Sequence, residues 1–134
     1  MAYPMRFART KRYKLIHNLN YWAPFPIDQD FYLAPTFQDL LQRTYHNQSL
    51  HWYKPSLQAY YQRPEYEFYD LKTDPEEKHN VAEKPKYKDK LTKLQNRLLK
   101  WQEKTHDPWI CSPHGVLEDK GHFKNNPQCL PLFN

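Results

Sequence analysis

The sequence predicts an α+β fold, in which a small antiparallel sheet of about four strands is covered by one long helix near the C-terminus. Three observations indicate this class. Two strand-like segments form a hairpin over residues 3–19, and a third strand-like segment covers 65–71. Residues 86–104 show the apolar spacing of an amphipathic helix. A length of 134 residues suits one domain with a single modest core.

The first half of the chain alternates extended and irregular stretches. In the hairpin, segments 3–8 and 13–19 are rich in aromatic and β-branched residues, and 9–12 is a polar turn. Residues 21–35 hold several prolines and aromatics, so we expect an irregular segment that packs against another surface. A short helix is predicted over 35–45, with Pro35 in its first turn. Residues 46–64 are expected to be a long connection.

The long helix over 86–104 is the element with the clearest pattern. Its apolar residues follow a 4-3-4-3 spacing and are expected to face the core: Tyr87, Leu91, Leu94, Leu98 and Trp101. Pro85 stands at its start and Pro108 follows its end. Before the helix, Asp70 and Asp74-Pro75 are predicted to be turn residues, because Asp side chains bond the following backbone amides.

The net charge of +5, with seven His not counted, indicates a basic surface. Such a surface is compatible with a nucleic acid, an acidic membrane or a sulfated glycan, and also with simple solvation, so charge does not choose a partner. No apolar run reaches membrane-spanning length, and the first residues contain no apolar core of a signal peptide. We expect either a cytosolic protein or a chain that begins inside a longer protein.

Two cysteines, Cys111 and Cys129, bracket a polar stretch in the tail over 108–134. In an oxidising compartment they would form a disulfide, whereas in the cytosol they would be two free thiols. Asn47 begins an Asn-Gln-Ser sequon in a polar stretch and is a candidate glycosylation site. Together these features favour the secretory pathway.

Known catalytic patterns are missing from the sequence. Two glycines cannot build a glycine-rich phosphate loop, and none of the three serines stands in a nucleophile motif. The His residues are scattered without zinc-ligand spacing. We therefore predict no catalytic residue and no metal site in this chain, and no activity of the chain alone.

Several longer stretches resemble the C-terminal module of the sulfatase family. The third strand, its turn and the long helix match this module through EFYDLKTDPEEKHNVAEKPKY, and the opening hairpin does so through MRFARTKRYKLIHNLN. Further segments are similar to the sulfamidase branch of the family: PFPIDQDFY, PTFQDLL, KWQEKTHDPWIC and GVLEDK. The resemblance runs from about residue 3 to 120 and resumes at PQC, so it covers nearly the whole chain.

The resemblance implies the non-catalytic C-terminal part of a sulfamidase-type sulfohydrolase. Such an enzyme removes N-linked sulfate from glucosamine in the lysosomal degradation of heparan sulfate. Its alkaline-phosphatase-like N-terminal domain, with a formylglycine nucleophile and a calcium ion, is absent from this chain. The implied partners are that missing domain, heparan sulfate and a second copy in a homodimer, and neither a nucleic acid nor a membrane.

Two residues are candidates for the substrate cleft, which the domain would support. Arg6 could bind a sulfate or carboxylate through its guanidinium, or it could form an inter-domain ion pair. His17 could contact substrate, or it could be a strand histidine satisfied within the fold. Cys111 in CSPHG is not expected to be a nucleophile, because the sulfatase signature has Arg where this chain has Gly115.

The sequence also departs from the family pattern at two places. Gln42 stands where the family can place its glycosylated Asn, and the tail after Lys120 differs. A hypothesis of another class is a free-standing basic module that binds heparan sulfate or another polyanion, based on the net charge and the Lys-rich helix. A third is a fragment that does not fold alone.

Overall fold

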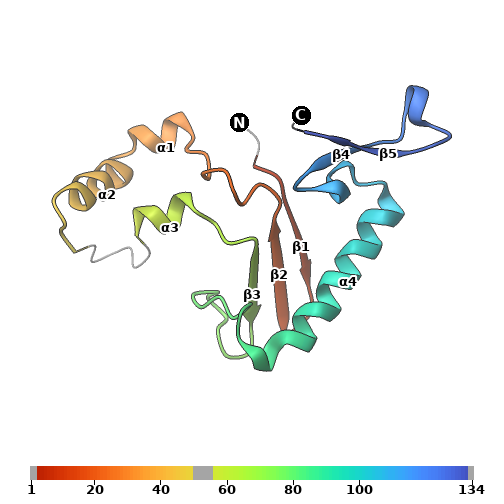
Figure 1. The fold of residues 1–134 in the computed structure, drawn as a ribbon. Coiled ribbons are helices and arrows are strands. Elements are labelled where there is room, and N and C mark those ends of the chain that lie inside the picture. Colours follow the sequence, from red (N-terminus) through yellow and green to blue (C-terminus); the bar gives the residue numbers. More distant parts are fainter. Residues whose placement is uncertain (1–2, 50–55, 133–134) are drawn as a thin grey trace. The chain divides into compact units, whose positions relative to one another are not determined.

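The computed structural model describes residues 3–49 and 56–132, and these form two compact units (Figure 1). One unit is built mainly from residues 21–64, and the other combines 4–20 with the chain from 65 onward. The length predicted one domain. The segment 21–64 forms a unit of its own because it buries apolar side chains of its own, among them Phe37 and Leu40.

A three-stranded antiparallel sheet organises the second unit. Its strands are β1 (Met5–Arg9), β2 (Tyr13–Asn18) and β3 (Tyr66–Asp70), in the order β1-β2-β3. β1 and β2 are the predicted hairpin, and the Thr10 backbone N–H donates to the Tyr13 carbonyl at 2.8 Å across the turn. β3 lies within the predicted range 65–71.

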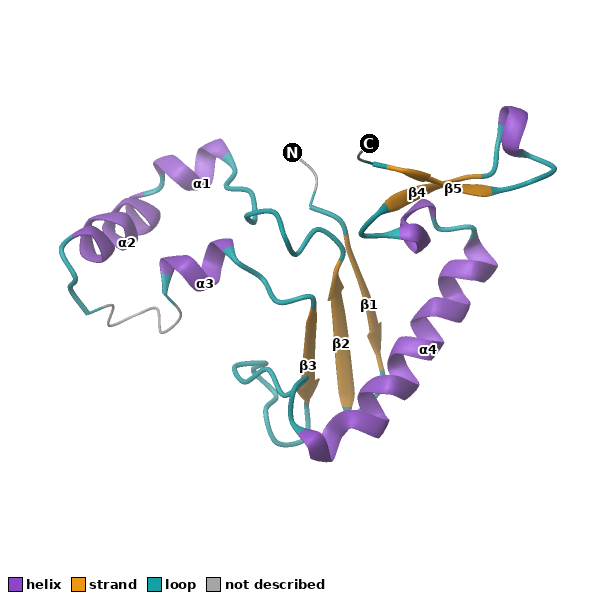
Figure 2. Cartoon of the chain, viewed as in Figure 1, coloured by secondary structure: helices purple, strands orange, loops and turns teal. Residues whose placement is uncertain are grey.

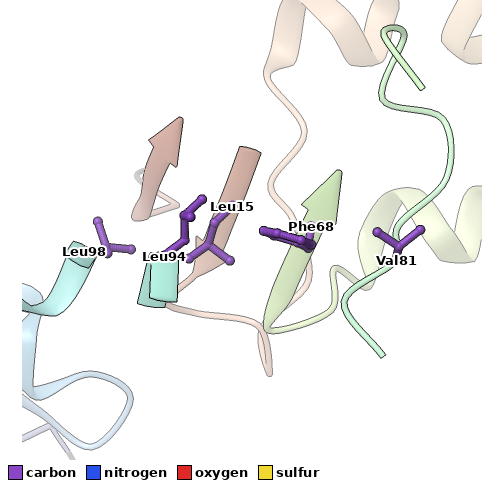
Figure 3. Packing of buried hydrophobic residues seen from close by; sticks show 5 residues of the cluster. All are labelled: Leu15, Phe68, Val81, Leu94 and Leu98. Atoms are coloured by element: carbon purple, nitrogen blue, oxygen red, sulfur yellow. The ribbon is translucent and has the colours of Figure 1, made fainter. Parts of the chain in front are cut away.

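A helical segment covers one face of this sheet. The 3-10 turn η1 (Pro85–Tyr87) leads into α4 (Lys88–Thr105), which packs against β1 and β2. The hydrophobic core between them consists of Leu15, Phe68, Val81, Leu94 and Leu98 (Figure 3). Tyr87 and Leu91 pack against this cluster, as their spacing predicted. The α+β class is therefore confirmed.

The prediction that Trp101 belongs to the core is wrong, since Trp101 is 49% exposed. The buried residue at this end of α4 is Gln102, at 5%. A helix turns by about 100° per residue, so a strict 4-3 spacing drifts around its axis and leaves the core-facing side after several turns. The Gln102 side chain instead turns inward and donates to the Asp107 carboxylate at 2.9 Å.

Two aspartates organise the turns at one end of the sheet, as predicted. Asp70 accepts two hydrogen bonds from the Arg12 guanidinium, at 3.0 and 2.9 Å. These bonds hold the pKa of Asp70 below its usual value. Asp74 accepts the backbone N–H groups of Lys78 and His79, at 3.1 and 2.8 Å. Asp70 also accepts the Lys72 backbone N–H at 3.3 Å, so both carboxylates satisfy backbone N–H groups of the turns that follow them.

The outer edge of β3 is paired with the segment that follows this turn. The Asn80 carboxamide accepts from the Phe68 backbone N–H at 2.9 Å and donates to the Tyr66 carbonyl at 3.0 Å. The Val81 backbone N–H donates to the Phe68 carbonyl at 2.8 Å. Asn80 thus imitates a strand residue and satisfies an edge that would otherwise be open.

The tail contains a second, two-stranded sheet, so the described strands divide into sheets of three and two instead of one sheet of about four. Its elements are η2 (Pro108–Cys111), β4 (Gly115–Glu118), η3 (Gly121–Phe123) and β5 (Gln128–Pro131). β4 and β5 have four residues each, too few for a clear alternating pattern. A Cβ at Gly115 would lie 2.7 Å from the Leu130 carbonyl oxygen, so only glycine allows the two strands to pair here.

The described residues of the first unit form three helices, α1 (Gln29–Leu33), α2 (Pro35–Tyr45) and α3 (Leu57–Tyr61). α2 covers the range predicted for the short helix. α1 and α3 were not predicted, because five residues are too few to show a helical period. α3 nevertheless has a start signal, since the Ser56 hydroxyl oxygen accepts from the Ala59 backbone N–H at 3.1 Å.

Aromatic rings dominate the packing of the first unit. The buried Phe37 ring lies 5.0 Å from the ring centre of Phe31 and 6.0 Å from that of Tyr60. Trp22 and Tyr32 are 45% and 47% exposed. Burial of such aromatics against another domain stays a prediction. None of the helices in the described part of the chain is long and apolar enough to cross a membrane.

Candidate functional site

The two candidate cleft residues, Arg6 and His17, are direct neighbours in the sheet. The register pairs Arg6 of β1 with His17 of β2, and His17 with Tyr66 of β3. All three side chains therefore stand on one face of the sheet, the face that also carries Leu15. Sequence analysis named Arg6 and His17 separately, and strand pairing brings them together.

The Arg6 guanidinium forms a bidentate ion pair with Asp107, just beyond the end of α4. Its Nε donates to Asp107 Oδ2 and its Nη2 to Oδ1, both at 2.7 Å, while Nη1 donates to the Met5 carbonyl at 2.9 Å. Asp107 is only 4% exposed. This pair joins the first strand to the end of the last long helix across 101 positions of sequence.

Asp107 is the centre of a small polar network. Its carboxylate also accepts from the Gln102 side chain at 2.9 Å and from the Trp109 backbone N–H at 3.2 Å. Burial raises the pKa of Asp107, but the hydrogen bonds from Arg6, Gln102 and Trp109 outweigh burial and leave its pKa below the usual value. The carboxylate is thus held ionised opposite Arg6.

These contacts define what Arg6 does within the chain. Its planar donor fork is occupied by a buried carboxylate of the same unit, whereas the sequence had suggested an ion pair between domains. The immediate effect is to hold α4 and η2 against β1. Contact of Arg6 with substrate stays a prediction.

His17 is partly buried between aromatic and acidic neighbours. Its ring stacks on Tyr66 at 4.5 Å, and its Nε2 lies 3.6 Å from Glu65 Oε1. Burial lowers the pKa of His17 below its usual value, against the opposing effect of Glu65. His17 therefore favours the neutral form near neutral pH.

A cavity of about 240 Å³ lies beside His17, between the sheet and one side of α4. Aromatic and uncharged polar side chains make up much of its lining: His17, Tyr66, Gln95, Asn96, Trp109 and Ser112. The Ser112 hydroxyl donates to the Leu19 carbonyl at 2.9 Å, so it is not activated by a base in this arrangement. The cavity offers hydrogen bonds and ring faces but no excess positive charge for a sulfate.

We predict that His17 makes the protein less stable in acid. Because its pKa is lowered in the folded state, the unfolded chain binds the proton more readily, and the free energy of unfolding falls as pH drops below about 6.5. His17→Gln should remove this part of the pH dependence. Urea unfolding at about pH 7 and about pH 5 measures it.

The exposed His122 supplies the control for this prediction. His122→Gln should leave the wild-type pH dependence unchanged. If His17→Gln and the wild type lose stability in parallel on acidification, the role given to His17 is wrong.

The expected disulfide between Cys111 and Cys129 is present. It links η2 to β5, and Cys129 pairs with Leu117 of β4 in the strand register. Because both sulfurs are bonded, the Cys111 thiol of the CSPHG stretch is not a nucleophile in this state.

Asn47 lies in an exposed turn directly after α2. Its backbone has a positive φ of 53°, which Asn tolerates better than most residues, and its N–H donates to the Thr44 carbonyl at 3.2 Å. The position is accessible to a glycosylating enzyme. Glycosylation itself stays a prediction.

Calcium is predicted for the rest of the complete protein, and not for the described residues of this chain. They contain no group of three or more His, Cys, Asp or Glu side chains that could hold a metal ion.

Sequence reasoning missed Asp107 and Gln102 as site residues. The motif HDP was interpreted only as the end of the helix, although Asp before Pro is also a signal for the cap of a new turn. Asp107 does cap η2, through the Trp109 N–H. Gln102 is polar, so the spacing of apolar residues in α4 could not indicate that it is buried.

Comparison with known proteins shows to which proteins the chain is related. No family profile matches the chain. Over all of its 134 residues the chain is 52% identical to human N-sulphoglucosamine sulphohydrolase, and it covers 26% of that protein, in its C-terminal part. The chain is homologous to the C-terminal part of a sulfatase.

Two more distant relatives support this assignment. The chain is 32% identical over 108 residues to an ulvan-active sulfatase of Formosa agariphila, and the match covers 72% of the chain and 16% of that protein. It is 30% identical over 105 residues to another ulvan-active sulfatase of this organism, covering 78% of the chain and 18% of that protein. The predicted resemblance to sulfatases is confirmed. The chain spans about a quarter of the length of the human relative and less than a fifth of the length of the two F. agariphila relatives.

Proposed function

We propose that this chain is the non-catalytic C-terminal part of a sulfamidase-type sulfohydrolase. The complete protein would remove N-linked sulfate from glucosamine during heparan sulfate degradation. The observation that carries this proposal is the 52% identity over the whole chain to a protein named for that substrate. The ulvan-active relatives support the broader class, hydrolysis of sulfate from a polysaccharide.

The chemistry of sulfate removal needs an activated nucleophile and positive charge near the sulfate oxygens. In this chain Cys111 is bonded to Cys129, and the Arg6 guanidinium is bonded to Asp107. We therefore assign the formylglycine nucleophile and the calcium ion to the rest of the complete protein. This chain would support the cleft through the rigid sheet and α4, and would take part in a homodimer.

The same proposal includes a lysosomal location, reached through the secretory pathway. The disulfide between Cys111 and Cys129 supports an oxidising compartment during folding. The exposed sequon at Asn47 suits glycosylation in that pathway.

The test compares the complete protein with the 134-residue chain. Each is incubated with N-sulfated glucosamine and, separately, with 6-O-sulfated glucosamine, and released sulfate is measured. We expect the complete protein to hydrolyse the N-sulfate and the 134-residue chain to release no sulfate. Activity of the short chain would contradict the non-catalytic role, and hydrolysis of the O-sulfate alone would contradict the substrate.

A further inference from the structure

Six cationic side chains follow one face of α4 and its entry turn, and we call this set the cationic stripe. Its members are Lys86, Lys90, Lys93, Arg97, Lys100 and Lys104. They are spaced alternately by four and three residues, which places them above one another on the same side of a helix. At about 1.5 Å per residue, the stripe is about 27 Å long, with about one charge per turn.

All six side chains of the cationic stripe lie on exposed residues. Among the described residues, no carboxylate forms an ion pair with them, although α4 also carries Asp89 and Glu103. By contrast, Lys14 pairs with Glu77 and Lys78 pairs with Glu76. The positive charge of the stripe is therefore not compensated within the chain.

Such an arrangement disfavours the helix unless an anion binds to it. Like charges three or four residues apart repel one another and destabilise an isolated helix. The hydrophobic core holds α4 in place through the buried Leu94 and Leu98, whereas the stripe residues are exposed, and α4 runs beside β1 (Figure 2). The fold thus carries a row of cations that packing does not require.

The surface beside the stripe is also positive. Arg97 lines a groove of about 410 Å³ together with Arg9 of β1, Leu94 and Trp101. No acidic residue lines this groove. An extended anion on the stripe would therefore find a further cation from the sheet and an apolar floor next to it.

We propose that the cationic stripe binds a linear sulfated glycan along its length. A straight row with one cation per turn suits a chain with repeated anionic groups better than a single small anion. The choice of a sulfated glycan over a nucleic acid rests on the proposed function, and the disulfide also favours a compartment outside the cytosol.

This site would hold long chains on the protein while their ends are processed. It should strengthen binding of long chains and leave hydrolysis of a monosaccharide substrate unchanged, because a monosaccharide is too short to contact several cations of the stripe. The affinity should depend steeply on salt, since bound cations release the counterions of the polyanion.

The test uses the complete protein with the substitutions Lys90→Gln, Lys93→Gln and Arg97→Gln combined. Gln keeps a good helix propensity, so α4 should remain folded. The matched control combines Lys72→Gln, Lys88→Gln and Lys124→Gln, which removes the same charge from exposed residues outside the stripe. Circular dichroism and melting temperature check the folding of both variants.

Binding to a long heparan sulfate chain is measured at several salt concentrations. We expect the wild type to lose at least about tenfold in affinity from about 50 to 200 mM salt. The stripe variant should bind at least about tenfold more weakly than the wild type at low salt, and the control within about twofold of it. Equal losses in the two variants would overturn the proposal, because net charge alone would then explain binding.

Two further arms separate the alternatives. Equally tight, stripe-dependent binding to a short single-stranded DNA would overturn the assignment to a sulfated glycan. A complete protein that fails to hydrolyse N-sulfate but binds heparan sulfate through the stripe would support this inference while contradicting the proposed function. The stripe variant should hydrolyse N-sulfated glucosamine at the wild-type rate.

Discussion

Phe68→Ala is expected to lower the free energy of unfolding by about 4 kcal/mol, the range found for large aromatic-to-alanine changes in cores. Phe68 is fully buried in the centre of β3. Its ring stacks on Tyr13 at 5.5 Å and meets Tyr87 edge-on at 6.2 Å. The substitution removes this contact area and leaves a cavity between the sheet and α4. Urea-induced unfolding monitored by circular dichroism measures the change.

The same substitution on the exposed β1 residue Phe7 is the control. Phe7 is 68% exposed, so Phe7→Ala should change the free energy of unfolding by no more than about 0.5 kcal/mol. Both residues lie in strands of one sheet, so the comparison separates burial from strand propensity. Similar losses for the two variants would contradict the placement of the core.

Arg6→Met is expected to destabilise the fold by about 3 kcal/mol, because it leaves the buried Asp107 carboxylate without its ion-pair partner. Arg6→Lys should lie between the wild type and Arg6→Met, since a lysine keeps the charge but loses the bidentate geometry. Arg9→Met removes an exposed charge from the same strand and should have little effect.

A double-mutant cycle with Asp107→Asn isolates the pair. The combined variant should lose less stability than the sum of the two single variants, because neither charge is then buried alone. Additive losses would show that Arg6 and Asp107 act independently and would contradict the pairing.

The pH dependence of this cycle has a definite sign. The pKa of Asp107 is lowered in the folded state, so its contribution is present above the unfolded value of about 3.9 and is lost as pH falls below it. The difference in stability between the wild type and Arg6→Met should therefore shrink below about pH 4. Unfolding midpoints measured across this range test it.

Local sequence patterns were sufficient to predict several helices and strands of this fold. The helices α2 and α4 were predictable because the helical period records which side meets the core, and the hairpin and β3 because their segments are rich in residues that favour strands. Asp70 and Asp74 were predictable as turn residues because each accepts a nearby backbone N–H, from Lys72 for Asp70 and from Lys78 for Asp74. The sulfatase relationship was also readable, because EFYDLKTDPEE and THDPW are specific strings.

The candidate site, in contrast, was decided by tertiary structure. Arg6 and Asp107 carry no mutual signal in the sequence, since only strand order and the length of α4 bring them within 2.7 Å. The burial of Gln102 in place of Trp101 combines the drift of the 4-3 spacing around the helix with a tertiary contact, the hydrogen bond from the Gln102 amide to Asp107. A sequence records which residues can be buried or charged, whereas the partner of a buried charge depends on how distant elements pack.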